Sequence, residues 1–125
     1  MSTAVPGPDA RYARMLEEGR FCIQRCLSCE KAVFYPREIC PHCGGGALEW
    51  FEPSGNGQVY STTVVRTRED PYNISIVQLD EGPRLMTRVV DMDPAAVKIG
   101  QQVTARVGEV DGVRAVLFVN REVRP

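Results

Sequence analysis

The sequence has little of what most catalytic sites require. Its single histidine, His42, lies between two cysteines, so no histidine is free to activate a serine or cysteine nucleophile. It has no glycine-rich phosphate loop of either familiar pattern, and Ser-Gly-Asn-Gly at 54–57 is short and precedes a strand-like segment, which predicts a turn. The carboxylates cluster in predicted turns, where solvated surface is the ordinary interpretation. These absences indicate that the chain is not a self-sufficient catalyst.

Charge of one sign and long apolar runs are also lacking. The 15 Lys and Arg residues nearly balance the 16 Asp and Glu residues, so no strong field would recruit nucleic acid or an anionic membrane. No apolar run approaches the length that spans a bilayer, and the N-terminus lacks a basic region followed by a hydrophobic stretch. We therefore expect a cytoplasmic protein, built as one compact domain or as two small units that share a core.

Four cysteines form the strongest pattern in the sequence. They stand in two Cys-x-x-Cys pairs separated by ten residues: Cys26, Cys29, Cys40 and Cys43. Two tight turns at this spacing can face each other and present four thiolates to one tetrahedral ion, as in a zinc ribbon. Four protein sulfurs complete the coordination sphere and leave no position for water or substrate. We therefore predict a structural zinc ion, Zn(2+), that performs no chemistry.

Other interpretations of these cysteines stay open at this point. Two Cys-x-x-Cys pairs can also hold a single iron in an electron carrier, and one pair can act as a thiol–disulfide couple. Cys22 lies four residues before Cys26, a spacing that forms no knuckle, so we expect a buried, small apolar residue there. His42 is expected to be exposed, because four thiolates already complete a ligand set. Phe34 and Tyr35 are expected to fill the interior of the ribbon.

The N-terminal region predicts one short amphipathic helix. Tyr12, Met15 and Leu16 recur at helical spacing. Asp9 is placed to cap the start of this helix, and Gly19 is placed to end it. A helix of this length is not stable alone in water, so its apolar face must dock on the chain's own core or on a partner.

The rest of the chain has the sequence pattern of a small β domain. Five segments are dense in β-branched residues and are separated by turn-like sequences: 57–67, 72–79, 84–90, 102–107 and 113–119. Asp111-Gly112 favours a hairpin, and residues 94–98 can hold one helical turn between the third and fourth strands. This pattern matches a five-stranded barrel of the OB type, with an SH3-like barrel as the nearest rival.

The predicted fold class is mainly β, with an N-terminal α-helix, a rubredoxin-like zinc ribbon and then a five-stranded OB-fold barrel. Residues 1–20 are expected to hold a flexible tail, through residue 8, and the amphipathic helix. Residues 21–47 are expected to form the zinc ribbon, which the glycine run 44–46 closes. Residues 48–125 are expected to form the barrel with a C-terminal tail.

OB barrels often bind single-stranded nucleic acid through aromatic platforms inside a basic groove. Tyr60 and Tyr72 could stack a base here. Four arginines could meet phosphates: Arg66, Arg68, Arg84 and Arg88. The weak overall charge counts against this function, and alternating strand positions show such residues on any solvent-facing sheet. A nucleic-acid-binding ribbon and barrel module is the alternative function.

The order of the modules and several local strings carry a family resemblance. The strings are Cys40-Pro-His-Cys43, Ser54-Gly-Asn-Gly57-Gln-Val-Tyr60, Ile76-Val-Gln-Leu-Asp-Glu-Gly-Pro83 and Ile99-Gly-Gln-Gln-Val103. On these features, residues 9–119 resemble the zinc-ribbon OB-fold proteins of bacteria and archaea that accompany thiolase-like enzymes. Two features depart from that family: Asn56 stands where it usually has a basic residue, and the C-terminus lacks its usual Phe-x-Pro close.

The resemblance implies a non-catalytic accessory subunit of a thiolase-fold enzyme, such as a thiolase, an acyltransferase or a retro-aldol lyase. That enzyme would make or break carbon–carbon bonds on acyl-CoA or related thioesters, with its catalytic residues in the partner of a hetero-oligomer. The ribbon and helix would pack on the partner, and the barrel would help shape the CoA passage, so that acyl-CoA is contacted only together with the partner. From the docking argument above, we hypothesise that Tyr12, Leu16 and Phe21 contact the partner.

Overall fold

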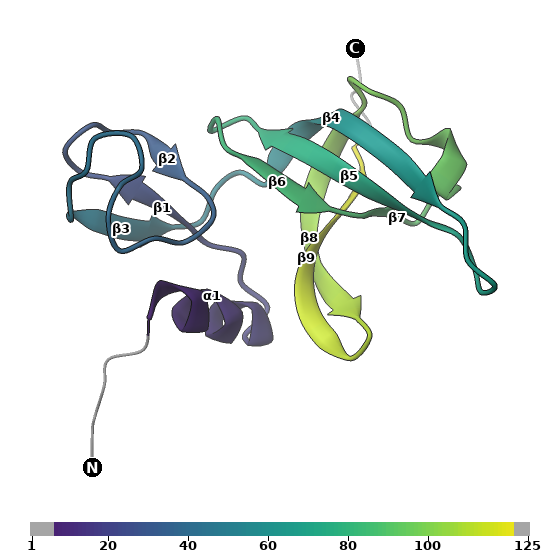
Figure 1. The fold of residues 1–125 in the computed structure, drawn as a ribbon, viewed down its shortest axis with the longest axis horizontal. Helices are drawn as coiled ribbons and strands as arrows, with labels where there is room; N and C mark the ends of the chain where they lie inside the picture. Colours follow the sequence, from purple (N-terminus) through teal and green to yellow (C-terminus); the bar gives the residue numbers. More distant parts are fainter. Residues whose placement is uncertain (1–6, 122–125) are drawn as a thin grey trace.

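The computed structural model describes residues 7–121, which form one α-helix and nine strands in two sheets (Figure 1). The predicted tails lie largely outside these residues. The elements are α1 (Pro8–Glu17), β1 (Ile23–Cys26), β2 (Ala32–Val33), β3 (Leu48–Phe51), β4 (Asn56–Val65), β5 (Tyr72–Leu79), β6 (Arg84–Thr87), β7 (Val89–Val90), a 3-10 turn η1 (Pro94–Ala96), β8 (Gln102–Val110) and β9 (Val113–Asn120). No helix in this described part is long and apolar enough to cross a membrane.

The helix α1 forms where the sequence predicted it, but its cap differs. It begins at Pro8 with Gly7 as the capping residue, so the prediction that Asp9 caps the helix is wrong. Proline has no N–H to satisfy and its φ angle suits the first helical turn, which moves the start two residues earlier. The helix ends as predicted: Gly19 has φ +81° and donates its N–H to the Leu16 carbonyl at 2.9 Å.

The apolar face of α1 docks on the chain's own core. Tyr12 is 8% exposed and Leu16 is 4% exposed, so neither is free to contact a partner as hypothesised. The Tyr12 ring makes edge-on contacts with Phe21 and Phe34, at centroid distances of 6.5 and 5.6 Å. Burial raises the pKa of the Tyr12 phenol. Phe21 is only partly buried and packs against the same core.

The ribbon is a three-stranded sheet in the order β2-β1-β3. β3, which lies beyond residue 47, pairs with β1 from Ile23 opposite Phe51 to Cys26 opposite Leu48. The ribbon's own buried cluster consists of Cys26, Val33 and Cys40, with Cys29 and Leu48 packed against it. The expectation that Phe34 and Tyr35 fill this interior is wrong. Because Val33 faces the cysteines, Phe34 points to the opposite side, into the main core, and Tyr35 is 51% exposed.

The barrel confirms the OB-fold prediction, with one strand divided. Its sheet has the order β6-β5-β4-β8-β9-β7. The predicted strand 84–90 breaks at Arg88 into β6, which pairs antiparallel with β5, and β7, which pairs parallel with β9. This one segment therefore joins the two ends of the sheet and closes the barrel. The predicted turn at 94–98 and the Asp111-Gly112 hairpin are both present.

A buried asparagine holds the strand break together. The Asn73 side chain donates to the Val89 carbonyl at 2.8 Å and accepts the Val89 N–H at 2.9 Å. Its oxygen also accepts the Ser75 hydroxyl at 2.8 Å. The amide thus replaces a strand neighbour for the backbone of β7, which would otherwise be left with unpaired polar groups in the core.

The barrel core and the N-terminal elements form one cluster. Its fully buried side chains include Phe118, Val59, Val77, Val103 and Leu79 from the barrel and Ile23 from the ribbon. Tyr12 and Leu16 of α1 belong to the same cluster. The helix, the ribbon and the barrel are therefore held in a fixed arrangement by shared packing.

Asn73→Ala should lower the free energy of unfolding by about 3 kcal/mol, because it leaves the Val89 N–H and carbonyl buried without partners. Chemical denaturation followed by fluorescence measures this change. Asn120→Ala removes an exposed side-chain hydrogen bond to Gln101 and should leave stability within about 0.5 kcal/mol of the parent. Equal stabilities for the two variants would contradict this role of Asn73.

Candidate metal centre and the neighbouring cleft

The two Cys-x-x-Cys turns repeat one backbone design. Glu30 donates its N–H to the Cys26 carbonyl at 2.8 Å, and Gly44 donates to the Cys40 carbonyl at 2.9 Å, at the same position after each knuckle. Both residues have left-handed backbones, with φ +64° at Glu30 and +77° at Gly44. The sequence signalled this conformation only at the glycine. The repeated turns aim the cysteine side chains of both knuckles at one point.

The structure brings the four predicted cysteines together. Their Sγ atoms, from Cys26, Cys29, Cys40 and Cys43, all lie within 4.8 Å of one another. The Cys26–Cys43 and Cys29–Cys40 sulfur distances are 3.5 and 3.7 Å. A disulfide would require about 2.0 Å. A zinc tetrahedron with Zn–S bonds of about 2.3 Å has edges of about 3.8 Å, so the spacing fits a bound ion.

Backbone amides favour the charged form at Cys26 and Cys43, but at Cys43 the neighbouring thiols outweigh the Gly45 amide and raise the pKa to about 11. The Cys29 amide, and after it the Ser28 amide, lower the pKa of the Cys26 thiol to about 6, although burial opposes this shift. The His42 N–H also points to the Cys40 sulfur, at 3.4 Å. Thiolate is the form that binds metal, so these donors suit the site to a cation.

The other two candidates lie apart from this cluster, as expected. Cys22 is 1% exposed and lies outside the four-sulfur group. Burial raises the pKa of its thiol, which makes it a poor nucleophile. The His42 side chain is exposed and also lies outside the group. The four sulfurs therefore form a closed donor set that can hold a structural ion but presents no group for acid–base chemistry.

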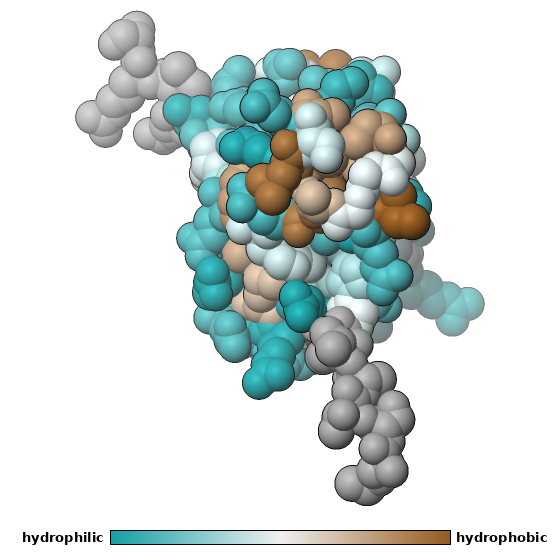
Figure 2. All heavy atoms as spheres, turned by 90° about the vertical axis from the view of Figure 1, so that its left-hand side faces the viewer, coloured by the Kyte–Doolittle hydropathy of each residue, from teal (hydrophilic) through white to brown (hydrophobic). Residues whose placement is uncertain are grey.

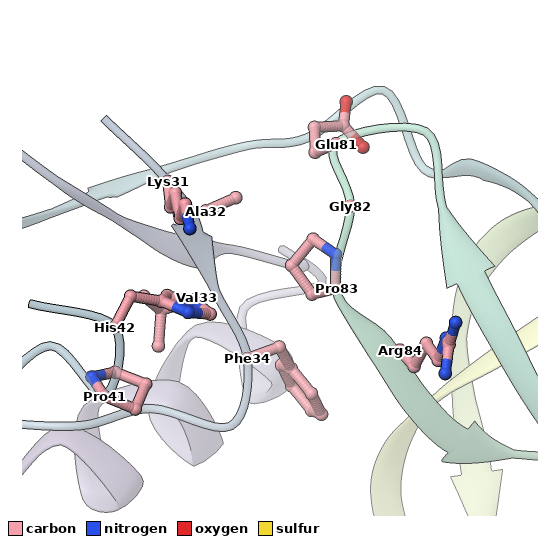
Figure 3. A pocket seen from close by; sticks show the side chains of 10 residues that line it. All are labelled: Lys31, Ala32, Val33, Phe34, Pro41, His42, Glu81, Gly82, Pro83 and Arg84. Atoms are coloured by element: carbon pink, nitrogen blue, oxygen red, sulfur yellow. The ribbon is translucent and has the colours of Figure 1, made fainter. Parts of the chain in front are cut away.

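A cleft of about 450 Å³ separates the ribbon from the barrel (Figure 3). Phe34 on the ribbon side and Pro83 of the β5–β6 turn both line it, and the Phe34 ring extends away from Pro83. Its titratable side chains are Lys31, His42, Glu81 and Arg84. The lining has no serine, threonine or cysteine, so it offers an apolar floor with a charged rim rather than a nucleophile and base. Sequence reasoning missed this cleft, although Pro83 belongs to one of the family strings.

The tyrosines and arginines that could bind nucleic acid do not form one basic groove. The Arg84 guanidinium covers the Tyr60 ring at 3.9 Å, and the Arg88 guanidinium covers the Tyr72 ring at 3.8 Å. A cleft of about 630 Å³ contains Arg68, Tyr72 and Arg88, but three carboxylates share it: Glu69, Asp70 and Asp111. An arginine therefore covers one face of each tyrosine ring, and the charge of the cleft is mixed, which does not favour phosphate binding.

The purified chain should contain one zinc ion per molecule, measured by mass spectrometry of the metal. Cys29→Ser should abolish this stoichiometry and lower the melting temperature, because structural zinc contributes on the order of 10 kcal/mol to folding. Cys22→Ser is the matched control outside the cluster and should retain the full stoichiometry. Iron in place of zinc, with a visible colour, would contradict the zinc assignment.

Two protein-family models match consecutive parts of the chain. The rubredoxin-like zinc ribbon domain of ChsH2 matches residues 14–49, and the C-terminal OB-fold domain of ChsH2 matches residues 50–108. Among solved structures, a chain of the "Ltp2-ChsH2(DUF35) aldolase" superposes with a TM-score of 0.80 at 31% identity, covering 95% of this chain and 98% of that one. A DUF35 protein of unknown function from Sulfolobus solfataricus shares the fold, with a TM-score of 0.67 at 16% identity over 92% of this chain and 87% of that one.

Curated relatives agree with these matches. A DUF35 domain-containing scaffold protein of Methanocaldococcus jannaschii is 36% identical over 118 residues, which cover 85% of this chain and 83% of the relative. A scaffold protein of the same description from Pyrococcus furiosus is 35% identical, with 90% of each chain covered. A probable enoyl-CoA hydratase alpha subunit of Thermomonospora curvata is 34% identical over 86% of this chain, which spans only 35% of that relative. This chain therefore belongs to the DUF35 family and carries a zinc ribbon and an OB-fold domain of the ChsH2 type.

Proposed function

We propose that this chain is a non-catalytic accessory subunit of a thiolase-fold enzyme that acts on acyl-CoA or related thioesters. One observation carries the proposal: the chain matches a component of the Ltp2-ChsH2(DUF35) aldolase over 95% of its length with a TM-score of 0.80. The scaffold descriptions of the archaeal relatives support a non-catalytic role. Thiolase, acyltransferase and retro-aldol lyase are the reactions that we propose for the partner.

The chemistry of the described residues supports a non-catalytic role. The four thiols that would hold zinc form a closed set, and Zn(2+) bound there would stabilise the ribbon without an open position for substrate. The cleft beside it lacks a nucleophile with a base. The partner would therefore supply the catalytic residues, and this chain would supply binding surface.

The surface of the ribbon offers apolar contacts to such a partner. Leu27, within the first cysteine knuckle, is 57% exposed, and Ile39, directly before the second, is 60% exposed. Figure 2 shows the side of the molecule on which the ribbon lies, and hydrophobic residues gather in its upper half. A gathering of exposed apolar groups, rather than a single one, is typical of an interaction surface. We place the contact with the partner on this ribbon surface, since the apolar face of α1 is already buried.

The acyl-CoA part of the proposal has a separate basis. It is supported by the relative described as a probable enoyl-CoA hydratase alpha subunit, of which this chain spans about a third. The barrel would border the passage for the CoA chain only when the partner is present. The isolated chain is expected to have no turnover and no measurable affinity for acyl-CoA.

The test is co-purification from the native host with the full chain as bait, followed by identification of every protein that elutes at a fixed ratio to it. We expect a thiolase-fold protein. Leu27→Asp combined with Ile39→Asp should abolish its recovery, because burying two carboxylates in an apolar contact is strongly unfavourable. Ile99→Asp is the control: it changes an apolar residue before β8 in the barrel that is 71% exposed, and it should leave recovery unchanged.

Recovery of nucleic acid, or of this chain alone, would overturn the proposed function. Recovery of a thiolase-fold protein by the double variant as well as by the parent chain would retain the function but remove the ribbon surface as the contact.

A further inference from the structure

One strand of the barrel is longer than the strand beside it. β8 runs from Gln102 to Val110, but its pairing with β4 covers only residues 102–104. Beyond Thr104 it pairs with β9, as far as Val110 opposite Val113. Figure 1 shows these parts of β8 and β9 leaving the barrel as a two-stranded arm. Among residues 7–121, no strand lies along the outer edge of β8 in this arm.

Two nearby bonds show where the backbone groups of that edge point. Ala105 donates its N–H to the Gly55 carbonyl at 2.8 Å, on the β4 side. Phe118, directly opposite Ala105, donates its N–H to the β7 side and not to β8. Hydrogen-bonded and non-hydrogen-bonded pairs alternate along an antiparallel ladder. Val107 and Glu109 therefore also direct their N–H and carbonyl groups away from β9, toward the open edge.

A groove of about 220 Å³ lies beside this edge. Residues 105–107 of β8 form one wall, and Phe21 with Pro53 contributes to the other. Ser54, just before β4, donates its N–H to the Glu81 carboxylate of the β5–β6 turn at 2.9 Å and makes no backbone hydrogen bond to β8. The groove therefore lies between the first part of this edge, as far as Val107, and the connection to the ribbon.

We propose that the outer edge of β8, at Val107 and Glu109, receives an extended segment of the partner subunit by strand addition. This inference rests on the proposed function, which supplies the partner. Open strand edges are templates for pairing, and their main-chain hydrogen bonds give affinity without requiring one particular side chain. The opposite edge of the arm is less available, because α1 packs against β9 and the Val116 carbonyl already accepts the Thr87 hydroxyl at 2.9 Å.

A second copy of this chain fits the edge less well than a single extended segment does. Two arms paired edge to edge would run antiparallel, so the Asp111-Gly112 turn of one copy would move toward Ala105 of the other. That position is occupied by Gly55, which already pairs with Ala105. A single segment can end before this point, whereas a hairpin turn needs more space.

Two proline variants separate the open edge from the rest of the arm. Glu109→Pro removes one N–H from the outer edge of β8, and Arg114→Pro, directly opposite, removes one from the outer edge of β9. Neither removes a hydrogen bond between the two strands, and both lose the same weak ion pair at 3.9 Å. Proline is tolerated where a strand N–H faces solvent, so the two variants should have similar stability.

The affinity of each variant for the identified partner is measured by calorimetry with the full chain. We expect Glu109→Pro to weaken binding by about tenfold or more, while Arg114→Pro and Glu109→Ala stay within about twofold of the parent. Hydrogen exchange of the Val107 and Glu109 amides should be fast in the free chain and slow in the complex.

Unchanged affinity for Glu109→Pro, with fast exchange of both amides in the complex, would overturn the inference and leave the proposed function standing. Slow exchange in the free chain that depends on its concentration would indicate pairing between copies and would also overturn it. If no thiolase-fold partner is recovered, the proposed function fails and this inference fails with it.

Discussion

The shared packing around Tyr12 is the contact on which the arrangement of the whole molecule depends. Its ring lies against Phe21 and Phe34, and the same buried cluster continues through Ile23 into the barrel. The ribbon has only a small buried cluster of its own, in which two of the three members are cysteines. A ribbon of this size needs both a metal ion at one end and a packing surface at the other to stay folded.

This arrangement suits the accessory role proposed for the chain. The apolar face of the helix is buried against the chain's own core, and the proposed contacts with another subunit are the knuckles of the ribbon and the edge of the barrel arm. A closed thiol set and a rigid shared core fix the relation between those two surfaces. Positioning of this kind requires no catalytic residue on the scaffold itself.

The sequence was sufficient for the features that follow from local rules. The spacing of the cysteines, the β-branched runs and the Asp111-Gly112 turn predicted the knuckles, most of the strands and the hairpin, because each depends on residues close in the chain. The sequence was insufficient where contacts between residues far apart in the chain determine the structure. The division of a predicted strand at Arg88 depends on the parallel pairing with β9, and the inward direction of Phe34 depends on a helix more than fifteen residues earlier. The open edge of β8 is likewise visible only once β4 is placed beside it.

Calorimetric unfolding of the metal-loaded full chain tests most directly whether the ribbon, helix and barrel form one unit. The shared core predicts a single transition, with the calorimetric enthalpy equal to the van't Hoff enthalpy, that moves as a whole to lower temperature when a chelator removes the metal. Two separate transitions, of which only the smaller responds to the chelator, would show that the barrel folds independently of the ribbon. That result would contradict the claim that the helix, the ribbon and the barrel are held in a fixed arrangement by one shared core.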